Sequence, residues 1–284
     1  MRSSLAWRLL RDARYALPHW VGRTVPAPDA RAAARLCERL HRRGLAVAVG
    51  YFEGASARPE DIVAAYGAVA ARLTGPASQG AYLSVKAPPL DFCEAHLREL
   101  ADTAQAAGLS LMFDAHGPEV ADRTLDAAER LLSAFPGTGC VLPARWRRSL
   151  GDAARFRDSS APIRIVRGEW PDPDRDEEDI EADYLALVSA LAGRQAPVAV
   201  ATHRPVLAER ALALLQDAGT PCELEQLRGL PRRRTVAVAR RAGVPVRVYV
   251  PFGPGWWPYA VDKALARPYL LSWMARDLLG LRGG

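Results

Sequence analysis

The chain has 284 residues, of which 49% are hydrophobic and 25% are charged, and its formal net charge is +6. This length is enough for one sizeable core, and no Gly/Ser-rich or Pro-rich linker divides the chain into two domains. The basic residues are scattered and are nearly all arginine, which argues against a nucleic-acid partner.

The cysteines and histidines indicate neither a metal site nor a disulfide framework. Cys37, Cys93, Cys140 and Cys222 form no CxxC pair, and no HExxH motif is present. This pattern fits a reducing cytoplasm. No apolar run reaches the length of a membrane span. The basic segment 1–20 lacks the apolar centre of a signal peptide. We expect a helix there that packs on the domain, and the alternative is an amphipathic helix at the inner face of a membrane.

Short apolar runs recur along the chain, each followed by a stretch with helical spacing. The runs predicted as strands are residues 45–52, 81–86, 109–115, 139–144, 163–168, 198–203, 222–227 and 246–253. Helical spacing is clear over 119–135, 184–192 and 206–218. The alternation predicts an α/β protein with a parallel sheet, and eight units match a TIM-like (β/α)8 barrel. A doubly wound open sheet is the alternative, but no GxGxxG motif follows any run.

We therefore predict an N-terminal helical segment over 1–44 that packs on a catalytic barrel over 45–284. Polar residues stand in or after six of the eight strand runs. They are Lys86, Asp114, His116, Arg164, Arg167, Thr202, His203, Glu223, Glu225, Arg247 and Tyr249. Because the carboxyl ends of barrel strands carry the chemistry of such enzymes, we expect one polar mouth on one face.

Several segments resemble, in order, motifs of the proline dehydrogenase family, in particular its short single-function bacterial members. They are YLSVK at 82–86, LMFD at 111–114, IRIVRG at 163–168, ATH at 201–203, ELEQLRG at 223–229 and RVYVPFG at 247–253, followed by WPY at 257–259 and RP at 267–268. The resemblance runs from about residue 51 to residue 279.

This resemblance implies a non-covalent flavin, FAD rather than FMN, over the mouth of the barrel. Arg164 would approach flavin N5 and favour the reduced anion. The implied cofactor-binding residues are Arg164, Val166, Arg167, Gly168, Thr202, His203 and Glu225. The implied reaction oxidises the carbon next to a secondary amine to an imine, with a quinone or oxygen as electron acceptor.

The resemblance also implies the residues around the substrate. Lys86 and Asp114 would form an ion pair below it, with a purely structural pair as the alternative, and Tyr249 would pack over its ring. Together with Arg164 these are the predicted catalytic residues. The predicted substrate-binding residues are Tyr259, Asp262, Lys263, Leu227 and Glu169.

The sequence departs from the family where that family binds the carboxylate of proline. Two adjacent arginines are replaced by Asp262 and Lys263, and an Asp facing a carboxylate repels it. Two glutamines of the flavin site are replaced by Pro143 and Glu225, and the KGAY stretch reads RGEW at 167–170.

We therefore expect either a substrate without a free carboxylate, such as an amine, amide, ester or carrier-bound prolyl group, or one with a second cationic group. One alternative is that Asp262 and Lys263 pair with each other and that the enzyme is an authentic L-proline dehydrogenase. The other is a non-enzymatic barrel that has lost its flavin.

Overall fold

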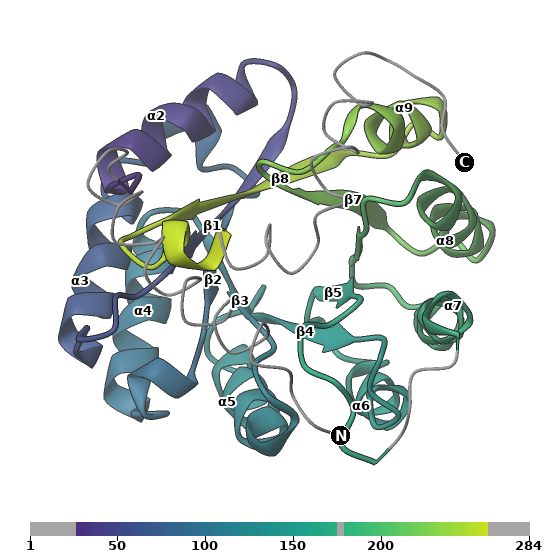
Figure 1. The fold of residues 1–284 in the computed structure, drawn as a ribbon, viewed down its shortest axis with the longest axis horizontal. Helices are drawn as coiled ribbons and strands as arrows, with labels where there is room; N and C mark the ends of the chain where they lie inside the picture. The colour runs from purple at the N-terminus through teal and green to yellow at the C-terminus, as the bar shows by residue number, and fades with distance from the viewer. Residues whose placement is uncertain (1–26, 175–178, 261–284) are drawn as a thin grey trace, which may run out of the picture.

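The computed structural model describes residues 27–174 and 179–260, which form a closed barrel of parallel strands (Figure 1). The strands are β1 (Ala46–Tyr51), β2 (Tyr82–Val85), β3 (Ser110–Phe113), β4 (Gly139–Pro143), β5 (Ile163–Val166), β6 (Val198–Ala201), β7 (Cys222–Leu227) and β8 (Val246–Phe252). They pair in chain order, and β8 closes the barrel on β1. The predicted fold class is therefore confirmed.

Helices surround the strands on the outside of the barrel (Figure 1). They are α2 (Ala30–His41), α3 (Pro59–Ala70), α4 (Glu94–Ala106), α5 (Ala121–Leu132), α6 (Ser149–Phe156), α7 (Ile180–Leu191), α8 (Pro205–Asp217) and α9 (Arg233–Arg241). Three short 3-10 turns are η1 (Gly75–Ala77), η2 (Pro88–Leu90) and η3 (Pro118–Val120). The helical stretch predicted from residue 119 begins as η3, and α5 follows it.

Helix α2 is the described part of the predicted N-terminal segment. It packs against α3, β1 and β8, and the carboxylate of Asp29 accepts a hydrogen bond from the backbone N–H of Ala32 at 2.6 Å. Such a cap satisfies one of the free N–H groups of a first helical turn. Residues 1–26 lie outside the described residues, so the domain boundary at residue 44 stays a prediction. Within the described ranges, no helix combines the length and the hydropathy that crossing a membrane requires.

Two hydrophobic clusters fill the molecule. The larger one lies between strands and helices, and the smaller one fills the inside of the barrel. The members of the smaller cluster are Ala48, Tyr82, Met112, Val141 and Tyr249, with Phe52, Ala115, Val166 and Leu227 packed at its edge. Buried polar side chains, among them Ser84, Arg164 and Glu225, share the barrel interior with these residues.

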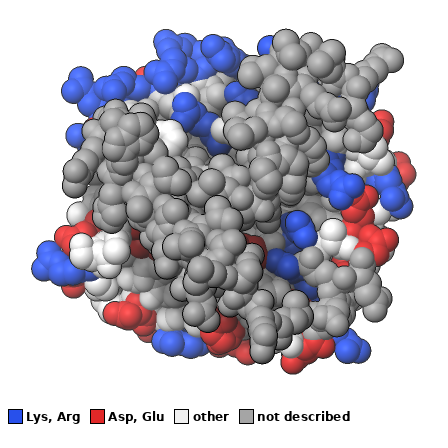
Figure 2. All heavy atoms as spheres, viewed as in Figure 1, with Lys and Arg blue, Asp and Glu red and all other residues white. Residues whose placement is uncertain are grey.

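The excess of basic residues lies on the outer surface. Figure 2 shows Lys and Arg side chains gathered along the edge that carries α2, whereas acidic and basic side chains alternate along the opposite edge. The exposed arginines in and just after α2 are Arg31, Arg35, Arg39, Arg42 and Arg43. The net charge of the chain therefore gives no information about the charge inside the barrel.

Arg194 is a buried arginine that is bound by backbone carbonyl groups. Its Nη2 donates to the carbonyl oxygens of Phe156 and Ser159 at 3.0 Å and to that of Ala161 at 2.9 Å. Burial lowers the pKa of its guanidinium. The side chain thus joins the end of α6 to the segment that enters β5.

We predict that Arg194→Met lowers the free energy of unfolding by about 2–4 kcal/mol, because several buried carbonyl groups lose their donor. Urea unfolding followed by circular dichroism measures this change. Arg98→Met is the control, because Arg98 lies on the exposed face of α4 and should change stability by less than about 0.5 kcal/mol. Equal effects of the two substitutions would contradict the role given to Arg194.

Candidate functional site

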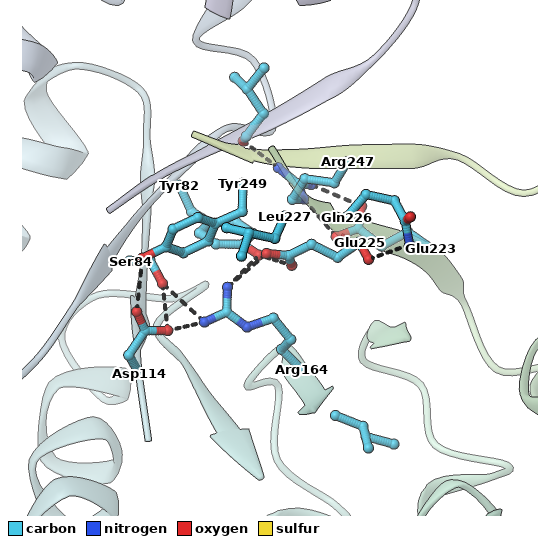
Figure 3. A network of polar contacts seen from close by, with 12 residues as sticks. Tyr82, Ser84, Asp114, Arg164, Glu223, Glu225, Gln226, Leu227, Arg247 and Tyr249 are labelled. Carbon is cyan, nitrogen blue, oxygen red and sulfur yellow. Dashed lines mark hydrogen bonds and ion pairs between the residues drawn. The ribbon is translucent and has the colours of Figure 1, made fainter. Parts of the chain in front are cut away.

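Arg164 stands at the centre of a polar network inside the barrel (Figure 3). It lies on β5 and is 4% exposed. Its Nη1 donates to Oε1 of Glu225 on β7 at 2.7 Å, and its Nη2 donates to Oδ1 of Asp114, just after β3. We call Tyr82, Ser84, Asp114, Arg164, Glu225 and Tyr249 the inner network. One guanidinium thus connects strands on opposite sides of the barrel.

Asp114 accepts hydrogen bonds on both carboxylate oxygens. Ser84 on β2 donates to Oδ1 at 2.7 Å, and the hydroxyl of Tyr249 on β8 donates to Oδ2 at 3.2 Å. The Tyr249 ring also faces the guanidinium carbon of Arg164, 5.3 Å from the ring centroid. The structure therefore brings together three of the four predicted catalytic residues, namely Asp114, Arg164 and Tyr249.

Glu225 is held in the same way from both sides. Its Oε1 binds Arg164, and its Oε2 accepts a hydrogen bond from the Tyr82 hydroxyl. Burial, and next to it the carboxylate of Glu225, raise the pKa of Tyr82 well above its usual value, so the hydroxyl stays a donor. Burial also raises the pKa of Tyr249. Burial alone would lower the pKa of Arg164, but Glu225 and the two tyrosines outweigh it, and that pKa is raised.

A second ion pair lies towards the amino ends of the strands. Arg247, the second residue of β8, binds both carboxylate oxygens of Glu223 at 2.6 and 2.9 Å, and its Nη1 donates to the carbonyl oxygens of Val47 and Gly80 at 2.7 Å. The prediction that Arg247 and Glu223 belong to the polar mouth is therefore wrong. The second position of a strand lies away from its carboxyl end, where the mouth is formed.

The described charges of the barrel interior do not balance. The two guanidinium groups of Arg164 and Arg247 face the three carboxylates of Asp114, Glu223 and Glu225. The tyrosines of the network stay protonated, so the formal sum is one negative charge. A further anionic group inside this network would meet repulsion that water screens poorly.

Lys86 lies beside the inner network without joining it. Its Nζ donates to Oε2 of Glu53 and to the carbonyl oxygen of Tyr51, both at 3.1 Å, and lies 4.1 Å from the ring centroid of Phe52. The predicted ion pair between Lys86 and Asp114 is therefore wrong. Arg164 reaches Asp114 from across the barrel, and Glu53, just after β1, supplies the carboxylate for Lys86.

Two more predicted substrate-binding residues meet at the mouth. The hydroxyl of Tyr259 lies 3.3 Å from Oε2 of Glu169, which connects the segment after β8 with the loop after β5. Phe52 and Trp256 pack on Tyr259 with ring centroids 5.0 and 5.9 Å away. Asp262 and Lys263 lie outside the described residues.

The loop after β5 carries the predicted cofactor-binding residues of that strand. Gly168 has φ +98°, a conformation that favours glycine, and a Cβ there would lie 2.8 Å from Cβ of Pro143. Val166 packs at the edge of the smaller hydrophobic cluster, and Arg167 is exposed. The loop therefore keeps a close approach of its backbone to β4.

Thr202 and His203 follow β6 at the same end of the barrel. His203 Nε2 accepts a hydrogen bond from the backbone N–H of Leu227 at 3.1 Å, and its Nδ1 lies 2.8 Å from the carbonyl oxygen of Pro231. Thr202 Oγ1 accepts from the backbone N–H of Arg204 at 3.2 Å. His203 thus fixes the end of β7 against the turn after β6.

Sequence reasoning missed Glu53, Tyr82 and Ser84. Tyr82 and Ser84 are two residues apart on β2, so their side chains face the same side of the strand. This alternation in the sequence could have identified both as residues that face the barrel interior. Within the described ranges, no group of three or more His, Cys, Asp or Glu residues is arranged to hold a metal ion. Burial raises the pKa of both Cys37 and Cys140 to about 12, so these thiols stay protonated.

The family model and the relatives found by sequence agree on one family. The family model described as proline dehydrogenase matches residues 33–256. Proline dehydrogenase 1 of Bacillus subtilis (strain 168) is 25% identical over 274 residues, which cover 90% of each chain. A proline dehydrogenase of Deinococcus radiodurans is 27% identical over 191 residues, 64% of this chain and 61% of that protein.

Solved structures give the same fold. Proline utilization A from Bdellovibrio bacteriovorus matches with a TM-score of 0.73 and 17% identity, over 84% of this chain and 32% of its own. The protein of that name from Corynebacterium freiburgense matches with a TM-score of 0.72 and 18% identity, over 97% of this chain and 34% of its own. This chain thus spans about a third of those larger proteins.

We predict that Gly50→Ala disrupts the inner network, because a Cβ at Gly50 would lie 1.8 Å from the Tyr249 hydroxyl oxygen. The ring must move, and its hydroxyl then leaves Asp114. Overpacking of this kind should lower the free energy of unfolding by about 1–3 kcal/mol, measured by urea unfolding. Gly67→Ala is the control, since a Cβ there meets nothing within 4 Å and a helical alanine should be neutral or stabilising. Equal stability of the two variants would count against this packing.

Proposed function

The chain belongs to the proline dehydrogenase family, and from that premise we propose that it is a flavin-dependent dehydrogenase of a secondary, proline-like cyclic amine. The observation that carries the proposal is the direct contact of Asp114, Arg164 and Tyr249 inside the barrel. A small-molecule amine is the substrate, and a quinone or a similar acceptor takes up the electrons. Oxygen is the alternative acceptor.

The reaction requires removal of two electrons from a carbon next to nitrogen. The C–H bond of that carbon breaks, the nitrogen lone pair forms the C=N bond, and the nitrogen must therefore be unprotonated when the electrons leave. A flavin held at the mouth would supply the redox chemistry as the acceptor of the hydride. Asp114 then stabilises the positive charge that develops on the nitrogen, since its carboxylate is already oriented by Ser84 and Tyr249.

The described residues fit a flavin at the mouth. Arg164 Nε is buried and has no hydrogen-bond partner among the described residues, although both Nη atoms are bound. A buried donor without a partner is unusual in a folded protein, and a flavin ring offers acceptors for it. Arg164 would hold the ring, while the loop around Gly168 and the turn with Thr202 and His203 would hold the rest of the cofactor. We propose FAD rather than FMN.

The charge inside the barrel supports a substrate without a free carboxylate. The terminal nitrogens of Arg164 are already bound by Asp114 and Glu225, and the described interior has one negative charge in excess. A substrate carboxylate would add a second. Amines, amides, esters and a carrier-bound prolyl group all avoid this repulsion. A substrate with a second cationic group would also be favoured.

Location within the cell stays a prediction. We predict a cytoplasmic protein, and its peripheral contact with a membrane would depend on segment 1–20. That segment lies outside the described residues.

The purified protein should be yellow and show the absorbance of an oxidised flavin. Chromatography of the flavin released by heat distinguishes FAD from FMN. Arg164→Met should weaken flavin binding at least about tenfold, because it removes a charge-assisted donor. Arg98→Met, on the exposed face of α4, should leave flavin binding unchanged. A folded but colourless protein that takes up no added flavin would instead indicate a non-enzymatic barrel.

Anaerobic reduction of the flavin by different amines tests the substrate class. We expect prolinamide or L-proline methyl ester to reduce it faster than L-proline does. The double variant Asp262→Arg with Lys263→Arg should raise the rate with L-proline at least about tenfold, because two arginines bind a carboxylate in bidentate fashion. Lys263→Arg alone is the control, because it conserves the positive charge at 263 and leaves Asp262 in place. Rapid reduction of the wild-type enzyme by L-proline would instead show an authentic proline dehydrogenase.

A further inference from the structure

We propose that Glu225 lowers the reduction potential of the bound flavin by adding a buried negative charge beside the ion pair of Arg164 and Asp114. This inference rests on the proposed flavin-dependent function. It assigns to Glu225 a positioning and electrostatic role, because Glu225 acts through another side chain of the network.

The salt bridge of Glu225 is with Arg164, whereas Arg247, the other buried arginine nearby, is paired with Glu223. Its carboxylate lies 2.7 Å from Arg164 Nη1, and the two side chains are 3% and 5% exposed. Its other oxygen is bound by the neutral Tyr82 hydroxyl. In such a buried position water screens little, so the charge of Glu225 acts strongly on any nearby group.

The sign of the effect follows from the charge of a flavin. Reduction makes the flavin more negative, so a neighbouring positive charge favours reduction and a negative charge opposes it. Arg164 alone would raise the potential. Asp114 binds the other terminal nitrogen of the guanidinium, so Arg164 and Asp114 together have no net formal charge. With Glu225 the three side chains have a net formal charge of one negative unit. The flavin should therefore be harder to reduce than one beside an unopposed arginine.

The charge of Glu225 can be removed without a change in the size of its side chain. Glu225→Gln keeps the shape of the side chain and an acceptor oxygen for Arg164, and it removes only the charge. Glu223→Gln is a matched control on the same strand. Glu223 also binds one arginine, Arg247, but stands two residues earlier, which is about 6–7 Å further from the mouth.

The experiment is a potentiometric titration of the flavin in the purified full-length enzyme and in each variant. At a fixed potential, E225Q should raise the ratio of reduced to oxidised flavin at least about tenfold, equivalent to about 30 mV for a two-electron couple. E223Q should change that ratio by less than about twofold, because its charge is further away. Thermal unfolding of the flavin-free proteins reports any purely structural effect.

Tyr82→Phe gives a second test with the opposite sign. It removes the donor that binds the other oxygen of Glu225, so the carboxylate presents more negative charge and the reduced fraction should fall. This variant keeps the proposal testable if E225Q does not fold.

The outcomes separate the two proposals. A wild-type protein that binds no flavin overturns the proposed function. Flavin that binds but shows no rise in E225Q, the same rise in E223Q, or a rise in Tyr82→Phe overturns the role of Glu225 and leaves the proposed function standing.

Discussion

The guanidinium of Arg164 is the interaction on which the barrel interior depends. A buried cation is stable only where its charge and its donors find partners, and here Asp114 and Glu225 supply them from two sides. In turn, Arg164 is what allows two carboxylates to stand in a closed space. Removal of Arg164 leaves two buried carboxylates without their shared cation, so both carboxylate positions depend on it.

The strands could be predicted almost residue by residue. Parallel barrel strands are buried on both faces, so they read as continuous apolar runs between turns. The run predicted over 222–227 is identical to β7, and the others differ by one or two residues at their ends. The differences lie at the strand ends. Lys86 and Asp114 were included in the predicted strand runs, but β2 ends at Val85 and β3 ends at Phe113.

The site was harder to predict because side-chain pairing depends on reach across the barrel. The family resemblance implies an ion pair between Lys86 and Asp114, which follow the neighbouring strands β2 and β3. The pairing instead depends on Arg164, whose long side chain crosses the interior from β5. Arg247 was misplaced for a related reason: its position near the start of β8, and its bonds to Val47 and Gly80, follow from the register of the closed sheet. Sequence shows which residues are charged, but register decides which of them meet.

Two of the departures from the family resemblance, at Glu225 and Asp262, act in the same electrostatic direction. By the resemblance, Glu225 replaces a neutral amide and Asp262 replaces an arginine, so each change makes the formal charge at its position in the sequence more negative. A carboxylate substrate needs positive charge for binding, and a flavin beside such charge is easier to reduce. A substrate without a carboxylate needs no positive charge for its binding. An amine that is more readily oxidised can reduce a flavin that lacks such a charge beside it. Under the proposed function, the charge around Arg164 therefore affects both which substrate binds and how easily the flavin is reduced.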